Sequence, residues 1–305
     1  MLAFSTHYIF AKELLPYIKE NSDFEINESA YFYGAQGPDL FFFHRVLPTM
    51  KGKPLRNIGS RLHRAKPELT FNTLREYCEK TQSNIARSYV YGFITHYSLD
   101  RICHPYVYAK QEELVKSGEF THGFTAHNEI EYSLDVYFLN KRMGIEKPYA
   151  FKTADTLSSE KQAIEETAKL LSAVLPIVTG DSLSEKDGET AILDMIYMQG
   201  VLRDTVGFKR AFAKCADAML KKFAGGFQLG VMIRTKDLEK AKKYANIDKK
   251  IWQSPYENGE RNESVDELFE LAKADAVNIF DAYTSGIDCR IITGNKSFLT
   301  GVEVI

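Results

Sequence analysis

The sequence has no histidine after residue 127. All seven histidines of the 305-residue chain lie before that point: His7, His44, His63, His96, His104, His122 and His127. Imidazole is the commonest protein ligand for zinc. The chain therefore divides into an N-terminal region that can bind metal through histidine and a longer remainder that cannot.

Excess charge and long apolar runs are also missing. The formal net charge is −2, so no global basic field attracts long nucleic acid or anionic lipid. No run approaches the ~18–20 apolar residues of a membrane span, and no basic segment precedes an apolar stretch at the N-terminus. The four cysteines, Cys78, Cys103, Cys215 and Cys289, form no CxxC pair. We expect buried free thiols and a cytoplasmic protein.

Apolar residues recur at spacings of three and four, and strict alternation is scarce, which predicts an all-α fold, a multi-helix bundle. The predicted helices are Thr6–Lys19, Gly59–Lys66, Pro67–Lys80, Ser83–Cys103, Ala126–Lys141, Ser158–Leu175, Glu189–Val206, Phe208–Phe223, Lys236–Tyr244 and Ser264–Tyr283. Thr6 is a candidate N-cap, and Ser264 with Glu267 matches a capping box.

Two segments differ from this pattern. Residues 33–53 contain GAQGPD, three consecutive phenylalanines and Pro48, so helix is not expected there, and Phe41–Phe43 must pack into the interior. The last residues, Cys289–Ile305, are expected to be extended. Gly144–Thr156 and Gly180–Thr190 are candidate boundaries. We expect a metal-binding region, residues 1–150, and a helical C-terminal region, residues 151–305. The role of the second region is unknown, and we expect it to pack on the first as one globular unit.

Two predicted helices carry histidine and carboxylate on one face, because residues four apart lie one above the other. On the first, Tyr89, Phe93, His96 and Asp100 share a stripe, and Gly92 thins that face for a close approach. His104 follows just before Pro105, where helices tend to end. On the second helix the stripe is His127, Glu131 and Asp135.

Each of these histidines alone is more often a core or surface residue than a ligand, and two such pairs carry little weight because about one is expected by chance in this chain. Convergence strengthens the metal hypothesis, since a further acid, Asp39, lies in a Gly-Pro loop and more histidines lie upstream. Two zinc ions about 3.5–4 Å apart can bind both the attacking and the leaving oxygen of a phosphate ester. Asp100 is placed centrally enough to bridge such ions.

Four stretches, GAQGPDLFFFH, RLHRAK, YGFITHYSLDRICHPYV and HNEIEYSLD, resemble in order the signatures of the zinc-dependent phospholipase C family. Those enzymes are all-α and share their metal-site architecture with P1/S1-type nucleases. The resemblance runs from about His7 to Asp135. It implies one zinc held by His63, His96 and Asp100, a second held by His104, His127 and Glu131, and a third held by His7 with Asp100 bridging. It also implies that Asp39 orients or deprotonates the attacking water.

The chain departs from the family at one ligand. Secreted members use the amino group of an N-terminal tryptophan, whereas the only tryptophan here is Trp252, so the expected number of ions is two or three. His44 is an alternative to His63 as ligand; otherwise it packs near Phe41–Phe43 or orients a ligand. His122 is expected in a surface loop.

The leading hypothesis is a zinc-dependent hydrolase of phosphoric esters, phospholipase C-like, with metal-activated water attacking phosphorus. Phe41, Phe42, Phe43, Tyr89 and Phe93 would flank the site. Its substrate is a phosphate ester, with a lipid as one candidate, and no long nucleic acid is expected. The alternatives are a P1-type nuclease or small-molecule phosphatase, and a non-catalytic helical protein that uses zinc for structure or sensing.

Overall fold

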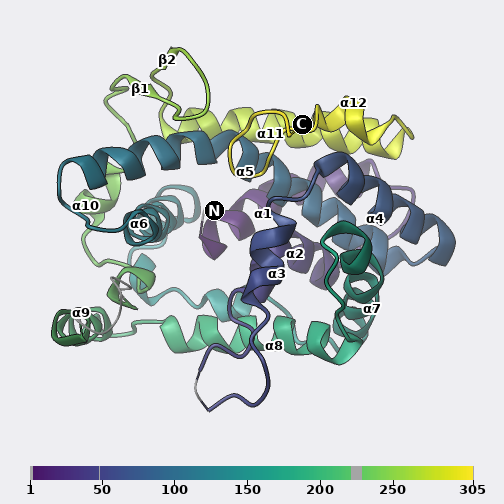
Figure 1. The fold of residues 1–305 in the computed structure, drawn as a ribbon, viewed down its shortest axis with the longest axis horizontal. Helices are drawn as coiled ribbons and strands as arrows, with labels where there is room; N and C mark the ends of the chain where they lie inside the picture. The colour runs from purple at the N-terminus through teal and green to yellow at the C-terminus, as the bar shows by residue number, and fades with distance from the viewer. Residues whose placement is uncertain (1–2, 48, 221–228, 305) are drawn as a thin grey trace.

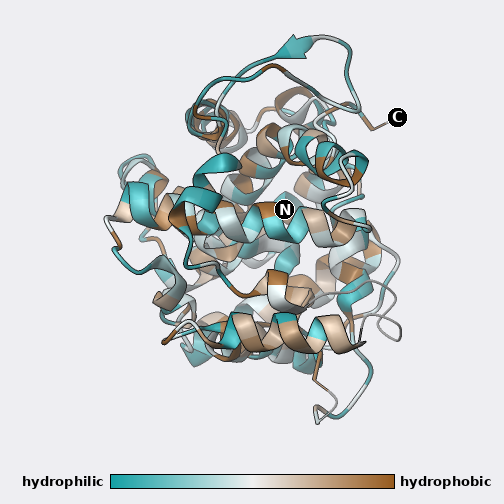
Figure 2. Ribbon diagram, turned by 90° about the vertical axis from the view of Figure 1, so that its left-hand side faces the viewer, coloured by the Kyte–Doolittle hydropathy of each residue, from teal (hydrophilic) through white to brown (hydrophobic). Residues whose placement is uncertain are grey.

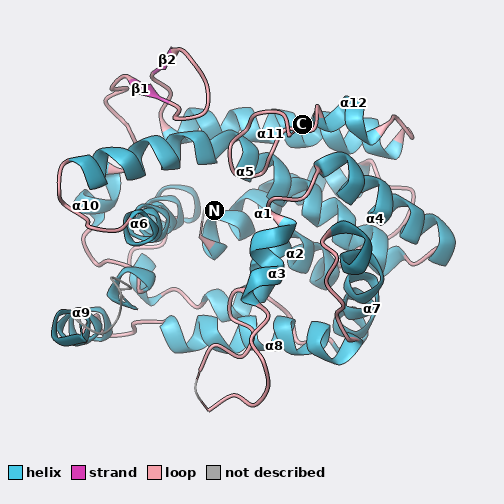
Figure 3. Cartoon of the chain, in the orientation of Figure 1, coloured by secondary structure: helices cyan, strands magenta, loops and turns pink. Residues whose placement is uncertain are grey.

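The computed structural model describes residues 3–47, 49–220 and 229–304, and its fold is an all-α bundle, as predicted (Figures 1 and 3). The α-helices are α1 (Phe4–Glu20), α2 (Glu28–Gln36), α3 (Arg56–Leu62), α4 (Pro67–Thr81), α5 (Asn84–Lys116), α6 (Gly123–Met143), α7 (Lys161–Val178), α8 (Glu185–Leu202), α9 (Lys209–Leu220), α10 (Leu238–Lys243), α11 (Val265–Thr284) and α12 (Cys289–Thr293). Short 3₁₀ helices are η1 (Gly37–Phe41), η2 (Pro148–Ala150), η3 (Thr153–Thr156) and η4 (Leu229–Met232). Strands β1 (Trp252–Gln253) and β2 (Glu260–Arg261) form an antiparallel pair.

Helix α5 is the central element, with α2 and α11 packed against it (Figure 1). Gly92 on α5 allows the close approach of α2, as the sequence suggested, because a Cβ there would lie 1.9 Å from the carbonyl oxygen of Tyr31. Gly34 on α2 is the reciprocal contact, since its Cβ would lie 1.9 Å from the carbonyl oxygen of Tyr89. The two glycines let the helix backbones touch.

The expectation that α5 ends at Cys103, before Pro105, was wrong, because α5 continues to Lys116. Proline removes the hydrogen bond to the carbonyl four residues earlier, which here is the carbonyl of Arg101. Gly301 lies against that carbonyl, where a Cβ would come within 2.7 Å of the oxygen and 3.1 Å of the Pro105 ring. The C-terminal segment thus packs on the turn at which helix propensity alone would end α5.

Helix was also wrongly excluded from the start of residues 33–53. Helix α2 includes Tyr33–Gln36 and is capped by the Asn27 side chain, and η1 follows directly. Gly34 permits helix packing instead of breaking the helix. Phe41 and Phe43 are buried and Phe42 is half-buried, so the prediction that these phenylalanines pack inward is confirmed; Pro48 lies outside the described residues.

Each of the ten predicted helices overlaps a helix of the structure, while α2 and α12 were missed. Residues 221–223 of the eighth predicted helix lie outside the described residues. The capping box of Ser264 and Glu267 is confirmed at α11. Thr6 is not a cap, because α1 begins before it. The expected extended C-terminus was wrong for Cys289–Thr293, which form α12 behind an Asp288 cap; an isolated bridge joins Lys296 and Glu303.

Two hydrophobic clusters form the core, and each combines residues from before and after position 150. Figure 2 shows hydrophilic and hydrophobic residues alternating along the helices, as expected when one face of each is buried. Cys78, Cys103 and Cys289 are buried as predicted, but Cys215 on α9 is exposed. No helix within the described ranges is long and apolar enough to cross a membrane.

Candidate metal centre

Eight histidine and carboxylate side chains from five segments converge in the interior. They are His7 from the first turn of α1, Asp39 from η1, His63 at the end of α3, His96, Asp100 and His104 from three successive turns of α5, and His127 and Glu131 from α6. All seven predicted ligands and the predicted catalytic acid therefore lie in one cluster. Spacing of four residues aligns those on α5 and α6, while tertiary packing brings in the rest.

The closed end of the cluster (His7, Asp39, His63, His96 and Asp100) is built around the Asp100 carboxylate. Oδ1 of Asp100 lies 3.3 Å from Nε2 of His7. Oδ2 lies 3.2 Å from Nε2 of His96 and 3.4 Å from Nε2 of His63. The same Nε2 of His63 is also 3.4 Å from Oδ1 of Asp39. All five residues are at most 2% exposed.

The open end (His104, His127 and Glu131) continues from the closed end along α5. Oε1 of Glu131 lies 3.1 Å from Nε2 of His127 and 3.7 Å from Nε2 of His104. His104 Nδ1 is 3.8 Å from Oδ1 of Asp100, which links the two ends. The side chain of His127 is 14% exposed, so solvent reaches the cluster here.

Four of the histidines are oriented by a carbonyl oxygen at Nδ1. The partners are the Gly59 carbonyl for His63 at 2.8 Å, the Ala35 carbonyl for His96 at 3.1 Å, the Phe298 carbonyl for His104 at 2.7 Å and the Gln111 side chain for His127 at 2.9 Å. A carbonyl oxygen only accepts, so Nδ1 is the donor in each pair and Nε2 is the nitrogen that can bind metal. Such pairing is typical of histidine ligands.

Burial keeps these imidazoles neutral, which is the form that binds metal. It lowers the pKa values of His63, His96 and His127, and that of His104 to about 4. Burial disfavours the charged form of Asp100, yet His104 and His96 hold its pKa well below the usual range. Burial, followed by the nearby Asp100 carboxylate, raises the pKa of Asp39. A bound cation would favour ionisation of both acids.

The cluster has buried polar atoms that the protein itself does not satisfy. Within the described ranges, both carboxylate oxygens of Asp39 and of Asp100, and Nε2 of His7 and of His104, make no hydrogen bond. An uncompensated carboxylate in the interior costs several kcal/mol. Divalent cations would compensate these groups, and imidazole with carboxylate is a donor set that suits zinc. The residues present therefore fit zinc.

Three groups have ligand atoms within 4.8 Å of one another: His7, His96 and Asp100; Asp39, His63 and His96; and His104, His127 and Glu131. The third is the set that the resemblance implied for one ion. At the closed end Asp39 lies as close to His63 as Asp100 does, at 3.4 Å. Asp39 is therefore as close to His63 as a second ligand of the same ion would be, so its position fits a ligand as well as a catalytic residue.

The remaining predicted residues lie outside the cluster. Nδ1 of His44 accepts a hydrogen bond from the Leu55 backbone at 3.1 Å, and its Nε2 is 4.0 Å from Asp187. His63, and not His44, is the residue that reaches Asp100. His122 is an exposed residue at the start of α6. Asp135 bonds to the start of α1 and has no contact with the histidines among the described pairs.

Of the five aromatic residues predicted to flank the site, two stack on histidines of the cluster. Phe42 stacks on His63 with ring centroids 5.8 Å apart, and Phe93 stacks on His96 at 6.3 Å. Phe298 was not predicted, although its ring lies 5.9 Å from that of His63 and 6.3 Å from that of His96. Its approach depends on the path of the C-terminal segment, which has no sequence signal near the histidines.

Gln111 was also missed, and here a signal existed. It follows His104 by seven residues, two helical turns along the same face. The predicted helix ended at Cys103, however, so Gln111 was not placed on that face. The carbonyls of Ala35, Gly59 and Phe298 carry no sequence signal, because every residue has one.

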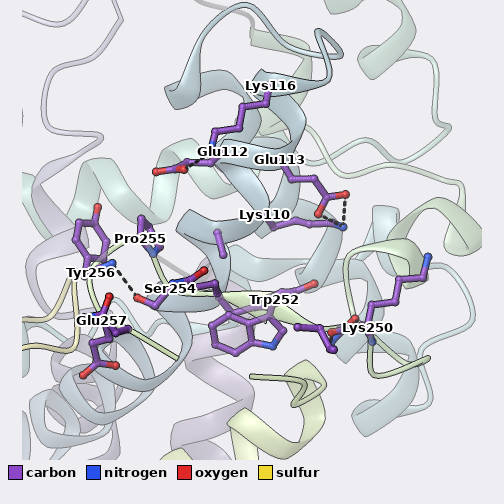
Figure 4. A pocket seen from close by; sticks show the side chains of 16 residues that line it. Lys110, Glu112, Glu113, Lys116, Lys250, Trp252, Ser254, Pro255, Tyr256 and Glu257 are labelled. Carbon is purple, nitrogen blue, oxygen red and sulfur yellow. Dashed lines mark hydrogen bonds and ion pairs between the residues drawn. The ribbon is translucent and has the colours of Figure 1, made fainter. Parts of the chain in front are cut away.

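A pocket of about 820 Å³ lies beside the open end, between α5 and the β1–β2 hairpin (Figure 4). Trp252, Tyr256 and the lysine and glutamate side chains of α5 line it, but none of the candidate ligands does. Tyr256 packs edge-on against Tyr108 at 5.4 Å, and Tyr108 contacts His127 at 4.9 Å. One layer of aromatic rings therefore separates this pocket from the cluster.

The fold and the cluster define an all-α protein with a buried histidine and carboxylate centre suited to zinc. A family model described as zinc dependent phospholipase C matches residues 6–177, more than half of the chain, and the chain belongs to this family. Comparison with curated proteins and with solved structures finds no match. The matched range includes all eight residues of the cluster but not Phe298.

Proposed function

We propose that the protein is a zinc-dependent hydrolase of phosphoric esters with two or three zinc ions. The observation that carries this proposal is the convergence of histidine and carboxylate side chains into three groups whose ligand atoms lie within 4.8 Å of one another. Among the described residues, the carboxylate oxygens of Asp39 and Asp100 make no hydrogen bond. Divalent cations would compensate these buried acids, and imidazole with carboxylate suits zinc. Membership of the phospholipase C family supports the same activity.

The proposed ligand roles are those that the family resemblance implies. His63, His96 and Asp100 would hold one ion, His104, His127 and Glu131 the second, and His7 with Asp100 the third, with Asp100 between them. Bound ions would supply Lewis-acid polarisation of a phosphate ester and a lowered pKa for a water molecule, the nucleophile of the proposed reaction. The chain's own carbonyls hold the imidazoles of His63, His96, His104 and His127 in the tautomer that binds metal.

Asp39 is the proposed acceptor of the proton from the attacking water. Its carboxylate is buried, it lies 3.4 Å from His63, and its oxygens accept no hydrogen bond from described residues. It is therefore available to orient a water molecule. Asp39→Asn tests this role against that of a ligand: a general base predicts lost turnover with zinc content retained, whereas a ligand predicts that zinc is lost as well.

The proposed substrate reaches the centre through the open end, where His127 is partly exposed to solvent. Phe42 at the closed end and Tyr108 at the open end supply apolar surface beside the ions. A phospholipid suits the family, and a nucleotide or other small phosphate ester suits the same chemistry. A cytoplasmic location stays a prediction.

The test is turnover of three compounds: a short-chain phosphatidylcholine, a dinucleotide and p-nitrophenyl phosphate. We expect hydrolysis of at least one, lost on chelation and restored by zinc. Elemental analysis of protein purified without a chelator or a histidine tag should give two or three zinc ions per chain. Zinc-loaded protein with no turnover on all three would favour the non-catalytic alternative, and absence of zinc would exclude both.

A further inference from the structure

Asp135 completes the polar stripe of α6 in the sequence, yet it bonds to the first turn of α1 instead of joining the cluster. Its Oδ1 accepts hydrogen bonds from the backbone N–H and the hydroxyl of Thr6, both at 2.8 Å. Its Oδ2 accepts the backbone N–H of Ser5 at 3.2 Å. The carboxylate is fully buried.

These bonds replace a cap that α1 lacks. The N-cap residue, Ala3, has no side chain that can accept the first N–H groups of the helix. A buried helix start needs such acceptors, and a carboxylate is the favoured one because it also complements the helix dipole. Asp135 therefore caps α1 from a different helix.

Arg234 holds the Asp135 carboxylate in this position. Its guanidinium donates to Oδ2 of Asp135 from Nη2 at 2.9 Å and from Nε at 3.2 Å. The same Nη2 also contacts the hydroxyls of Ser5 and Thr153. Arg234 and Asp135 are both buried, so this ion pair is shielded from solvent.

The start of α1 matters because His7 is the next residue after Thr6. Its Nε2 lies 3.3 Å from Asp100, and its ring stacks on His96 with centroids 4.2 Å apart. Unlike the four histidines with a carbonyl at Nδ1, His7 has no such partner among the described residues. Its position therefore depends on where the backbone of α1 begins.

We propose that Asp135 is a positioning residue for the proposed zinc site: by fixing the first turn of α1, it holds His7 against Asp100. This inference rests on the proposed function, since it assumes that His7 binds an ion. It assigns Asp135 no ligand role, and it extends the site to Arg234, which lies beyond the family match.

The experiment compares zinc content and affinity, by elemental analysis and chelator competition, in the full-length protein. Asp135→Asn keeps the shape but turns an amide toward N–H donors. We expect it to weaken the ion bound through His7 by about 10–100-fold. His7→Ala should remove the same ion, and adding Asp135→Asn to it should cause no further loss of zinc.

The matched control is Glu129→Gln. Glu129 is a buried acid on the same helix, paired with Arg210 at 2.8 Å and Lys240 at 2.7 Å, but not with α1. It should bind zinc as the wild type does. Thr6→Val provides a milder second variant if Asp135→Asn does not fold; it removes one bond to Asp135 and should weaken the same ion by a smaller factor.

The outcomes separate the two proposals. A wild-type protein without zinc would overturn the proposed function itself. With zinc in the wild type, the positioning role is overturned if Asp135→Asn, or Thr6→Val where the first is unfolded, binds zinc unchanged. It is equally overturned if the loss adds to that of His7→Ala, or if Glu129→Gln loses the same ion.

Discussion

The closed and open ends of the cluster contain the same residue types, histidine and carboxylate, but differ in how their histidines are oriented. At the closed end, backbone carbonyls orient two histidines: the Ala35 carbonyl of α2 orients His96, and the Gly59 carbonyl of α3 orients His63. At the open end, the Phe298 backbone carbonyl orients His104, but a side chain, Gln111, orients His127, which is also the one partly exposed histidine of the cluster. Backbone carbonyls are fixed by the fold, whereas a half-buried glutamine can change rotamer. We therefore expect the open end to exchange metal and admit substrate, and the closed end to retain its ions.

The C-terminal segment joins the two ends. The Phe298 carbonyl orients His104 at the open end, and the Phe298 ring packs against His63 and His96 at the closed end. Arg101, the neighbour of Asp100, holds the same segment through the Thr293 carbonyl at 2.7 Å. Residues far beyond the family match thus contribute to the surroundings of the centre.

The largest expected effect comes from Asp100→Asn, which attacks both ends at once. Asp100 contacts three histidines of the closed end and lies 3.8 Å from His104. Loss of its charge should weaken zinc binding at the closed end more than about 100-fold and weaken the open end less. Elemental analysis after dialysis against a weak chelator measures this. Asp275→Asn, which alters an acid paired with Arg101, is the control; equal zinc in all three proteins would contradict the bridging role.

Removal of the ions should make the protein sensitive to acid. Burial lowers the pKa of His104 from 6.5 to about 4, so between these values the unfolded chain binds a proton that the folded chain does not. The free energy of unfolding of the chelated protein then falls as pH drops below 6.5, by about 2 kcal/mol at pH 5 from His104 alone. Above pH 6.5 this contribution is constant.

Urea unfolding of chelated protein at pH 7.5 and pH 5 measures this effect. Asp39, whose pKa is raised by burial, acts in the opposite direction, so the difference between wild type and His104→Gln isolates the histidine. The variant should lose less stability on acidification. An identical pH dependence in the two proteins would show that His104 is not held neutral by burial.

The sequence predicts the cluster better than it predicts its surroundings, for a physical reason. His96, Asp100 and His104, and likewise His127 and Glu131, lie four residues apart, so helical periodicity alone places each set on one face. His7, Asp39 and His63 enter only through tertiary contacts, so periodicity cannot place them, and the family resemblance supplied their roles. Phe298 lies 194 residues from His104 and Arg234 lies 99 residues from Asp135, and no local pattern encodes such contacts.

The helices show the same division between local and tertiary information. Amphipathic spacing predicts α1 and α3–α11, but glycines that permit close packing were read as breaks in α2. Pro105 was read as the end of α5, whose second half carries Gln111. These errors arise where packing overrides propensity, and they lie next to the candidate site.

A smaller effect, confined to one end, is expected for Gln111→Leu. The variant removes the acceptor at 2.9 Å from His127 Nδ1 while keeping a side chain of similar size. Zinc at the open end should bind about 10–100-fold more weakly, and the closed end should be unchanged. Competition with a chromogenic chelator resolves the two classes of ion. Glu113→Gln, on the same helix but paired only with Lys110 among the described residues, should bind zinc normally. Normal zinc binding by Gln111→Leu as well would contradict the proposed role of Gln111 at the open end.

The smallest effect on zinc is expected for His44→Phe, which tests whether buried histidines outside both ends matter. His44 is fully buried, but it accepts the Leu55 N–H at 3.1 Å and faces Asp187, away from Asp100. Phenylalanine leaves that N–H without its acceptor, which should lower the free energy of unfolding by about 1–3 kcal/mol. Zinc content should not change, because His63 occupies the position beside Asp39 and Asp100. Loss of an ion in His44→Phe but not in His63→Phe would reverse this assignment and make His44 the ligand.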